Sequence, residues 1–324
     1  MNYFCCYFDK NYLLRGLTLF RSLCQHNKKP FTFYVICLDD YVYEVLLTLN
    51  RDIKNIVPIA LSSIEGYEKE LLNAKSNRSL IEYYFTLTPV IQLFLLDTYQ
   101  IDMIVYLDAD LYFYADTSPI FDAFSNHSIL LIEHKFPENL KHKEIYGKYN
   151  VQFLIFKKDI NGISALKWWK DKCIEWCYDF PENDRYADQK YLDHFEKKFN
   201  NVLIFDHNGV GLAPWNFMKY TIKQDDSCIK IDNQDLIFFH FHGLKVINKY
   251  FINRGLNGYY SKSLSKEMKF LYSSYAKQII LTAKWLKTNY TYKIGMSDSD
   301  IRKQLSLPKI IYSSIKNKQL AFVR

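Results

Sequence analysis

The start of the chain alternates between short apolar runs and amphipathic segments, and this pattern constrains the fold more than any other. NYFCCYF (residues 2–8) and FTFYVICL (31–38) are continuous apolar runs of strand length, and a third lies at 56–61. Between the first two, apolar residues recur at spacings of four, three and four, which is one face of a helix: Leu13, Leu17, Phe20 and Cys24. A short helix is expected at 42–46. Strands that alternate with helices in this way predict an α/β fold with a mainly parallel sheet flanked by helices.

The rest of the chain continues this alternation. Residues 65–98 are expected to be mostly helical, with a break near Thr88-Pro89 because the residue before a proline disfavours the helical conformation. We predict strands at 101–107, 128–133, 150–157 and 202–206, helices at 160–178 and 186–197, a late strand pair at 228–232 and 235–241, and a long helix near 263–288.

Charge divides the chain into an acidic body and a basic tail. Residues 244–324 hold 16 Lys/Arg and 3 Asp/Glu, a net charge of +13, whereas the remainder carries −6. We therefore predict a catalytic domain at 1–243 and a basic, mostly helical extension at 244–324. The stretch KEMKFLYSSYAKQIILTAKWLK (266–287) mixes apolar and lysine residues as interfacial helices do, so the extension either contacts an anionic membrane or covers the body with its apolar face. Nucleic-acid binding is disfavoured, because basic and aromatic residues are not interleaved on a recognisable fold.

Composition predicts a cytoplasmic protein. No run of about 18 apolar residues predicts a spanning helix. The amino terminus has neither a basic segment nor an apolar stretch long enough for a signal peptide. The seven cysteines show no paired CxxC spacing, so we expect small buried hydrophobes in a reducing compartment. If the tail binds a membrane, the protein would instead lie peripherally on the inner face of the cytoplasmic membrane.

Two aspartates follow the predicted strand at 101–107. Asp108 and Asp110 are two positions apart, so on an ideal strand their carboxylates would share one face and repel each other. Asp9 and Asp39–Asp40 also follow predicted strands, and ligands of open α/β sheets gather at the carboxyl ends of the strands. A divalent cation such as Mn²⁺ or Mg²⁺ would offset the repulsion and leave positions for a diphosphate. Asp298-Ser299-Asp300 has the same spacing without a preceding strand and is interpreted as a solvated loop or helix cap.

Several motifs occur in a recognisable order. A β-α-β start is followed by YLDAD, a later strand opening with Asn150, a helix containing Asp188-Gln189, and a terminal HFHG. Over residues 2–245 this order resembles the nucleotide-sugar glycosyltransferases of the GT-A (Rossmann-like) fold, and within them the family 8-like branch, which includes bacterial envelope-polysaccharide enzymes. The resemblance implies a mixed, mainly parallel sheet, a nucleotide-sugar donor and a saccharide or lipid-linked acceptor.

The resemblance also implies site residues. Asp108 and Asp110, with Ala109 between them, would hold Mn²⁺ or Mg²⁺ against the donor diphosphate, and the third ligand would be His240 or His242. Asp188 and Gln189 would face the donor sugar at the reaction centre, or else form an ordinary exposed helix start. Asn150 would contact the donor or the acceptor, although the glycine of the family's Asn-Gly pattern is absent here. The family's arginine on the helix before the DAD strand is absent, because that helix reads YYFTLTP.

Other candidates rest on position alone, and each has a purely structural alternative. Tyr7 and Asp9, at the end of the first strand, are placed to touch the nucleoside, for which uridine is expected by resemblance. Lys75 and Arg78 could add positive charge near the donor, or be solvated. Four residues are candidates for the acceptor side: Glu133, His134, Trp215 and Asn216. Core packing is the alternative for Trp215. An acid/base role is also open for Glu133 and His134.

Three functions stay open at this point. The favoured one is a metal-dependent glycosyltransferase, retaining by resemblance, in bacterial surface polysaccharide synthesis. A nucleotidyltransferase of related fold is disfavoured, because CCYFDKNYLLRG follows the start of strand 1 where a Gly-rich basic phosphate loop would be needed. A non-catalytic carbohydrate-binding or scaffold protein of the same fold is the third.

Overall fold

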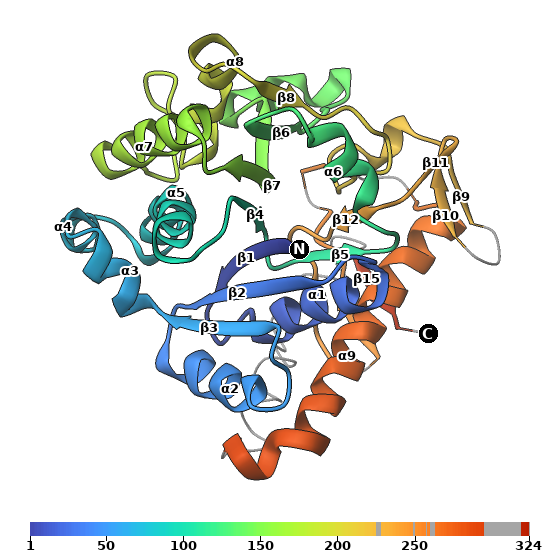
Figure 1. The fold of residues 1–324 in the computed structure, drawn as a ribbon. Helices are drawn as coiled ribbons and strands as arrows, with labels where there is room; N and C mark the ends of the chain where they lie inside the picture. The colour runs from blue at the N-terminus through green and yellow to red at the C-terminus, as the bar shows by residue number, and fades with distance from the viewer. Residues whose placement is uncertain (225–227, 249, 257, 260–262, 295–318, 324) are drawn as a thin grey trace.

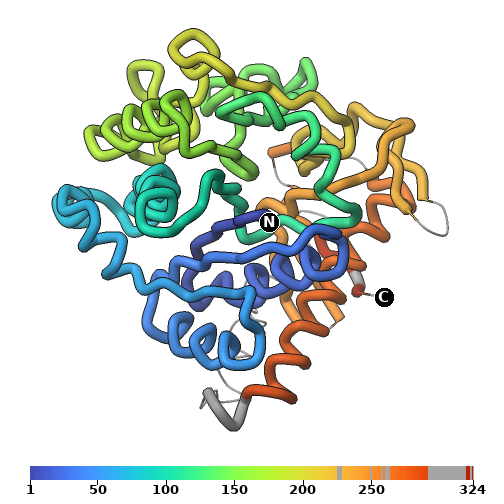
Figure 2. Tube along the Cα trace, viewed as in Figure 1, coloured from blue at the N-terminus to red at the C-terminus, as the bar shows by residue number. Residues whose placement is uncertain are grey.

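The computed structural model describes residues 1–224, 228–248, 250–256, 258–259, 263–294 and 319–323 (Figures 1 and 2). Its centre is a seven-stranded sheet in the order β3-β2-β1-β4-β7-β6-β8. The strands are β1 (Asn2–Phe8), β2 (Phe31–Cys37), β3 (Ile56–Ala60), β4 (Met103–Leu107), β6 (Ile129–Glu133), β7 (Tyr149–Lys157) and β8 (Val202–Ile204). Strand β7 runs antiparallel to both of its neighbours and the other pairs are parallel, so the predicted mixed, mainly parallel sheet is confirmed.

Helices cover both faces of the sheet. Successive side chains of a strand point to opposite faces, so each apolar strand presents a surface to be covered on either side. Phe4, Cys6 and Phe8 of β1 belong to one core cluster, and Cys5 belongs to the other. The first cluster includes residues of α1 (Leu13–His26), α2 (Asp40–Asn50) and α9 (Lys266–Ile294). The second includes residues of α3 (Leu61–Tyr67), α4 (Glu70–Asn77), α5 (Leu80–Thr98) and α7 (Ile160–Glu175). All seven cysteines are free thiols, and five of them are buried.

Helix α5 corrects one prediction. It continues from Leu80 to Thr98 through Pro89 without the expected break. Ser79 and Glu82 form a capping box at its start, and nearly every residue of its second half is buried against the core, so packing outweighs the hydrogen bond that the proline removes. By length and composition α5 also qualifies as a membrane span, which the apolar-run count missed, but 67% of that stretch is buried inside the protein.

Short elements fill the sequence between the long ones. These are α6 (Ser118–Phe124), α8 (Phe195–Lys198) and the 3₁₀ segments η1 (Glu138–Tyr146), η2 (Gln189–His194) and η3 (Phe217–Lys219). The helix predicted at 186–197 is thus formed by η2 and α8. The strand predicted at 235–241 divides in two. Its start, β11 (Gln234–Asp235), pairs with β10 (Ile229–Ile231) beside β9 (Ile222–Gln224), whereas β12 (Phe238–His240) pairs with β5 (Leu111–Phe113).

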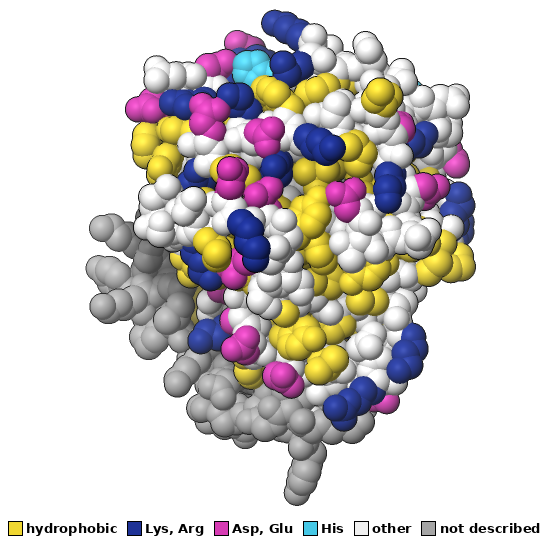
Figure 3. Space-filling model, turned by 60° about the vertical axis from the view of Figure 1, so that its left-hand side comes forward, with side chains coloured by type: hydrophobic (Ala, Val, Ile, Leu, Met, Phe, Trp, Pro, Cys, Tyr) yellow, Lys and Arg dark blue, Asp and Glu magenta, His cyan; other side chains and the backbone are white. Residues whose placement is uncertain are grey.

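The surface mixes charges of both signs where Figure 3 shows it. Basic and acidic side chains alternate there with hydrophobic ones, and the described residues form no broad patch of one sign on that face. Ion pairs such as Lys75–Glu65 and Lys170–Glu68 accompany this mixture.

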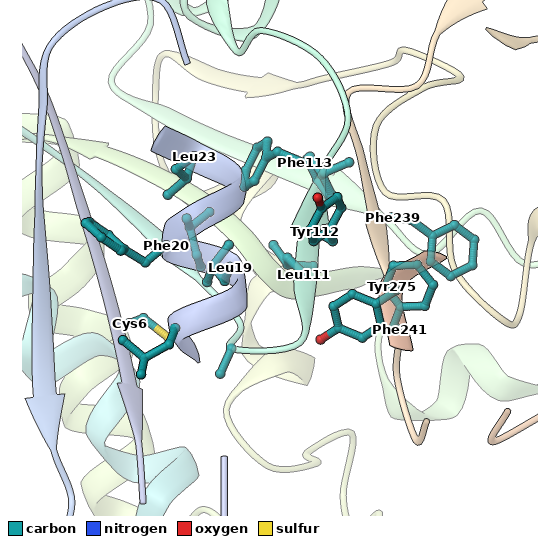
Figure 4. Close-up of a cluster of buried hydrophobic side chains, with 14 of the residues drawn as sticks. Cys6, Leu19, Phe20, Leu23, Leu111, Tyr112, Phe113, Phe239, Phe241 and Tyr275 are labelled. Atoms are coloured by element: carbon teal, nitrogen blue, oxygen red, sulfur yellow. The ribbon is translucent and has the colours of Figure 1, made fainter. Parts of the chain in front are cut away.

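The described residues after Gly243 pack on the body. Three short strands form a small sheet, β13 (Lys245–Val246), β14 (Phe251–Asn253) and β15 (Leu320–Phe322), and α9 lies against α1 and α2. The Tyr275 ring of α9 stacks on Phe241, which follows β12, with 3.9 Å between ring centroids and 11° between planes (Figure 4). Asp298 and Asp300 lie outside the described residues.

Candidate active site

Adjacent strands deliver the predicted residues to one edge of the sheet. β1 and β4 are parallel neighbours, so Asp9 and Asp108, which follow them, lie at the same edge. Because β7 runs antiparallel to β4, its first residues, including Asn150, also lie there. β12 reaches this edge by pairing with β5, where His240 stands opposite Leu111 and therefore beside Asp110.

One histidine separates the two carboxylates. His240 Nε2 lies 3.0 Å from Asp110 Oδ1 and 3.9 Å from Asp108 Oδ2. The Tyr106 hydroxyl donates a hydrogen bond to Asp108 Oδ1 over 3.0 Å. The Phe241 amide donates to the Asp110 carbonyl over 3.0 Å, which fixes the histidine strand against the DAD turn. An imidazole and a phenol thus offset the like-charge repulsion that the sequence predicts.

Burial and this histidine give the two carboxyl groups different pKa values. Burial raises the pKa of Asp108 to about 6, because the attraction of His240 compensates only part of the lost hydration. Burial also acts on Asp110, but the charge and hydrogen bond of His240 outweigh it and lower the pKa of Asp110 to about 2. In turn, burial would lower the pKa of His240, yet Asp110 raises it above its usual value. Asp110 and His240 are therefore a buried, hydrogen-bonded pair in which each side chain favours the charged form of the other.

These side chains fit a divalent cation. One ligand atom each from Asp110, His240 and His242 lies within 4.8 Å of the others. His240 Nδ1 is buried and has no hydrogen-bond partner among the described residues. Carboxylate oxygens with imidazole nitrogens suit Mn²⁺, and the oxygens alone suit Mg²⁺. Asp108 Oδ2 lies 3.9 Å from His240 Nε2, beside this group.

The cluster stands between two pockets. The larger pocket has a volume of about 520 Å³ and the smaller about 370 Å³. Six residues line both: Tyr7, Phe85, Tyr106, Asp108, His240 and His242. A ligand that extends from one pocket into the other would therefore pass directly over the carboxylates.

The larger pocket collects several predicted residues. It is lined by Asn150, Asp188, Gln189, His134 and Trp215. Burial raises the pKa of Asp188 to about 7, and nearby Asp108 adds to that shift. The Trp169 indole donates to the Asp188 carbonyl over 2.8 Å, and the Gln189 amide donates to the Tyr146 carbonyl over 2.7 Å.

His134 forms part of the pocket wall and holds it together. Asn150 Nδ2 donates to His134 Nε2 over 2.7 Å, and His134 Nδ1 lies 3.3 Å from the Lys148 carbonyl, to which it donates in the matching tautomer. Burial lowers the pKa of His134 to about 3, so the ring is neutral. Asn216 lies behind it, donating to the carbonyls of His134 and Gly211, and lines neither pocket.

Three further candidates contact other parts of the protein and line neither pocket. Glu133 pairs with Lys148 over 3.0 Å. Lys75 pairs with Glu65 over 2.7 Å. Arg78 donates to Thr86 Oγ1 and to the carbonyls of Cys173 and Ile174 at the end of α7. The structure therefore does not bring Glu133, Lys75 and Arg78 together with the aspartates.

The structure adds residues that the sequence analysis missed. Asn11 and Tyr12, just after Asp9, line the smaller pocket together with Asp9 and Ala109. The polar-aromatic group D-x-N-Y at the end of β1 is the signal that could reveal them. The outer part of the larger pocket is rich in aromatic side chains, with one lysine: Phe136, Lys143, Tyr146, Phe180, Tyr186 and Tyr259. They come from three segments: the β6–β7 connection that contains η1, the α7–η2 connection, and the stretch after β14. No local pattern connects the three segments.

Comparisons with known proteins bear on the family and on the fold. The model of glycosyl transferase family 8 matches residues 4–246. The uncharacterized protein YfnF of Bacillus subtilis (strain 168) is 33% identical over 255 residues, covering 76% of this chain and 82% of YfnF. Among solved structures, the galactosyltransferase LgtC in complex with donor and acceptor sugar analogs superposes with a TM-score of 0.51 at 14% identity, over 86% of this chain and 95% of LgtC. The glycosyltransferase GlyE of Streptococcus pneumoniae TIGR4 superposes with a TM-score of 0.52 at 13% identity, over 89% of this chain and 63% of GlyE. At these identities the two structures bear on the fold alone.

Proposed function

Because the chain belongs to glycosyl transferase family 8, we propose that this glycosyltransferase is metal-dependent and transfers a sugar from a nucleoside diphosphate donor, a UDP-sugar, to a saccharide or lipid-linked acceptor. The observation that carries the proposal is the cluster of Asp108, Asp110, His240 and His242 at the junction of the two pockets. A donor that crosses this junction would place its diphosphate against the cluster and its two ends in separate pockets.

The cluster would hold Mn²⁺ or Mg²⁺. When bound, the cation supplies a Lewis acid that stabilises the negative charge growing on the departing nucleoside diphosphate. His240 lowers the pKa of Asp110, so this carboxylate is ionised before a cation arrives. His240 would bind the cation in its neutral form and would lose its proton on binding. Mn²⁺ is the better fit of the two, because imidazole nitrogen is a poor ligand for Mg²⁺.

The smaller pocket is suited to the nucleoside. Asp9 is held in place by the Asn11 amide (2.9 Å) and side chain (2.8 Å), so its carboxylate and the Asn11 side chain face the pocket as a fixed polar edge. Tyr12 and Tyr84 add aromatic rings on which a base can stack. Tyr7 and Ala109 line the route to the diphosphate.

The inner part of the larger pocket is suited to the donor sugar and the reaction centre. Asp188 can accept a hydrogen bond from a sugar hydroxyl, and Gln189 and Asn150 offer amide groups on the same pocket wall. Phe85, Val151 and Ala187 make the neighbouring surface apolar, which limits the water that could compete with the acceptor. We assign transfer of a hexose with retention of configuration to this centre.

The outer part of the larger pocket is suited to a saccharide acceptor. Trp215 is only 3% exposed, yet it lines the pocket and contacts the rings of His242 and Tyr259. Aromatic faces such as these pack against the C–H faces of sugars. His134 lies beside Trp215 as part of the same wall, and Glu133 and Asn216 stand behind it as supports of the acceptor side.

We further propose that the enzyme works in bacterial surface polysaccharide synthesis on the cytoplasmic face of the membrane, with residues 1–243 as its catalytic domain and 244–324 as an extension that contacts anionic lipid.

The apolar face of α9 packs into the core, since Leu271, Ile279 and Leu286 are buried. Its exposed side carries Phe270, Leu281 and five lysines: Lys266, Lys269, Lys277, Lys284 and Lys287. Each lysine near an anionic surface contributes about 1 kcal/mol, so co-sedimentation with phosphatidylserine vesicles should be strong at low salt and detectable at physiological salt. Absence of binding at both salts would contradict membrane contact.

Donor hydrolysis tests the central proposal. UDP-, GDP- and CDP-hexoses are incubated with Mn²⁺, and release of nucleoside diphosphate is measured; turnover of a UDP-hexose is expected. Asp110→Asn should abolish it, whereas Asp300→Asn, which changes the other D-x-D sequence, should leave it unchanged. Titration calorimetry of UDP with and without Mn²⁺ distinguishes a carbohydrate-binding scaffold, which would show no metal-dependent affinity. A nucleotidyltransferase would instead join a nucleoside triphosphate to a sugar phosphate and release pyrophosphate.

A further inference from the structure

Arg15 connects the two sides of the candidate active site without lining either pocket. It lies on the first turn of α1, directly after the group that forms the polar edge of the smaller pocket. Its guanidinium Nη1 donates to the Asn11 carbonyl over 3.2 Å, and its Cζ lies 4.7 Å from the centroid of the Tyr12 ring. Arg15 therefore holds both of these pocket residues that follow Asp9.

The other arm of the guanidinium reaches the histidine segment. Nη2 donates to the Leu244 carbonyl over 2.9 Å. Leu244 closes a turn in which its amide donates to the Phe241 carbonyl over 3.1 Å, and Gly243 adopts a φ of +72° that favours glycine. His242 stands inside this turn. One side chain thus joins the nucleoside side of the site to the turn that presents a candidate metal ligand.

The charge of Arg15 also acts on the cluster. Among the described residues it forms no ion pair within 4.0 Å, yet it is near enough to Asp110 to favour the ionised carboxylate. An arginine suits this position better than a lysine, because its planar fork can donate to two carbonyls in fixed directions while its face stacks on an aromatic ring. A lysine would keep the charge and lose the bridge.

We propose that Arg15 is a positioning residue that fixes the Asn11–Tyr12 wall relative to the His242 turn, so that the nucleotide and the cation bind cooperatively. A nucleoside diphosphate has its base in one pocket and its diphosphate at the cluster, and it can satisfy both only if their separation is fixed. The inference rests on the proposed function, because it assumes that this cluster binds a cation and the smaller pocket a nucleoside. It goes beyond that function by assigning the coupling between the two to a residue that touches neither ligand.

Binding measurements test this directly, with Arg21→Met as the matched control. Arg21 lies on the same helix and faces Trp285, with its Cζ 5.0 Å from the ring centroid. For the wild-type protein, calorimetry gives the affinity of UDP, GDP and CDP without metal and at saturating Mn²⁺, and the ratio measures the coupling. Because a hydrogen bond from a charged group is worth about 1.5–3 kcal/mol, Arg15→Met should reduce this ratio about tenfold or more. Arg15→Lys should give an intermediate ratio, and Arg21→Met should leave it unchanged.

The outcomes separate the two proposals. A wild-type protein that binds no nucleotide in a metal-dependent way overturns both. A wild-type protein with strong coupling that Arg15→Met and Arg15→Lys retain overturns the role of Arg15 alone. A lower melting temperature with unchanged coupling would show that Arg15 only stabilises the fold, and this result also refutes the proposal. If Arg15→Met does not fold, Arg15→Lys decides the question by its coupling ratio.

Discussion

Replacing Tyr275 by alanine should loosen the strand that carries the two histidines proposed as metal ligands. The Tyr275 side chain is fully buried, and its ring stacks on Phe241, which stands between His240 and His242. Removing a large buried aromatic side chain costs about 3–5 kcal/mol, because the transfer free energy of the ring is lost and a cavity remains. For a chain of this size, about 2 °C of melting temperature accompanies each kcal/mol, so the midpoint should fall by about 6–10 °C.

The same change should weaken metal binding. Without the stacked ring, Phe241 can move, and the two flanking imidazoles lose their fixed directions. Groups that orient metal ligands change metal affinity by about 10–100-fold when they are removed, so we expect the Mn²⁺ dissociation constant of Tyr275→Ala to rise on the order of tenfold. Calorimetric Mn²⁺ titration together with thermal unfolding measures both effects.

Tyr275→Phe is the matched control. The Tyr275 hydroxyl is buried and has no hydrogen-bond partner among the described residues, so it contributes a desolvation cost and no bond. Burying a polar group in this way costs about 1–3 kcal/mol, and removing it should leave the melting temperature unchanged or raise it. If Tyr275→Phe is as unstable as Tyr275→Ala, the hydroxyl and not the stacked ring holds the strand. If Tyr275→Ala melts and binds Mn²⁺ as the wild type does, the reasoning is wrong altogether.

Three further changes test other parts of the structure. The folded-state pKa of His134, about 3, lies below its ordinary value, so stability is complete above about pH 6.5 and declines by at most about 1.4 kcal/mol per pH unit as the pH falls below that value. Urea unfolding of His134→Gln should therefore depend less on pH in this range, and an unchanged slope would refute the buried neutral ring. Arg78→Met should lower the free energy of unfolding by about 3 kcal/mol and leave the donor KM unchanged, because the charged hydrogen bonds of Arg78 go to Thr86 and the end of α7. A raised donor KM at an unchanged melting temperature would show instead that Arg78 contacts the donor. Gly211 has a φ of +74°, and an added Cβ would lie 2.8 Å from an Ile132 methyl. Gly211→Ala should therefore lower the free energy of unfolding by about 1–3 kcal/mol, measured by thermal unfolding. Gly66→Ala is the control, because a Cβ there meets open space and should not destabilise the protein.

Strands and strand ends can be predicted from the sequence because their signals are local. The apolar runs of β1, β2 and β4 are continuous, as expected for strands covered on both faces, and the parallel order places the residues that follow them at one edge. The strand pattern is therefore sufficient to place Asp9 and Asp108 at the same edge. The order of the motifs also selects Asp188, which lines the larger pocket. Trp215, chosen for its loop position alone, lines it too.

Contacts between distant segments cannot be predicted in this way. Pro89 favours a helix break, but burial of α5 decides its conformation. Arg78 has the right charge and a nearby position in the sequence, yet carbonyl groups about 95 residues later bind its guanidinium. Asn11 and Tyr12 escape sequence analysis because a short polar turn carries little pattern of its own. In each case the deciding interaction is formed by residues that no local periodicity connects.

The pairing of β5 with β12 has a consequence for how the protein is made. His240 meets Asp110 although they are 130 positions apart in the chain, and Tyr275 follows later still. Such non-local contacts form slowly, because the entropy of closing a long loop is lost before any contact compensates it. A nascent chain on the ribosome therefore carries its two aspartates without their histidine until at least 130 more residues have been added. The proposed donor cleavage, which needs this histidine strand in place, should therefore begin only once α9 has been made and has docked.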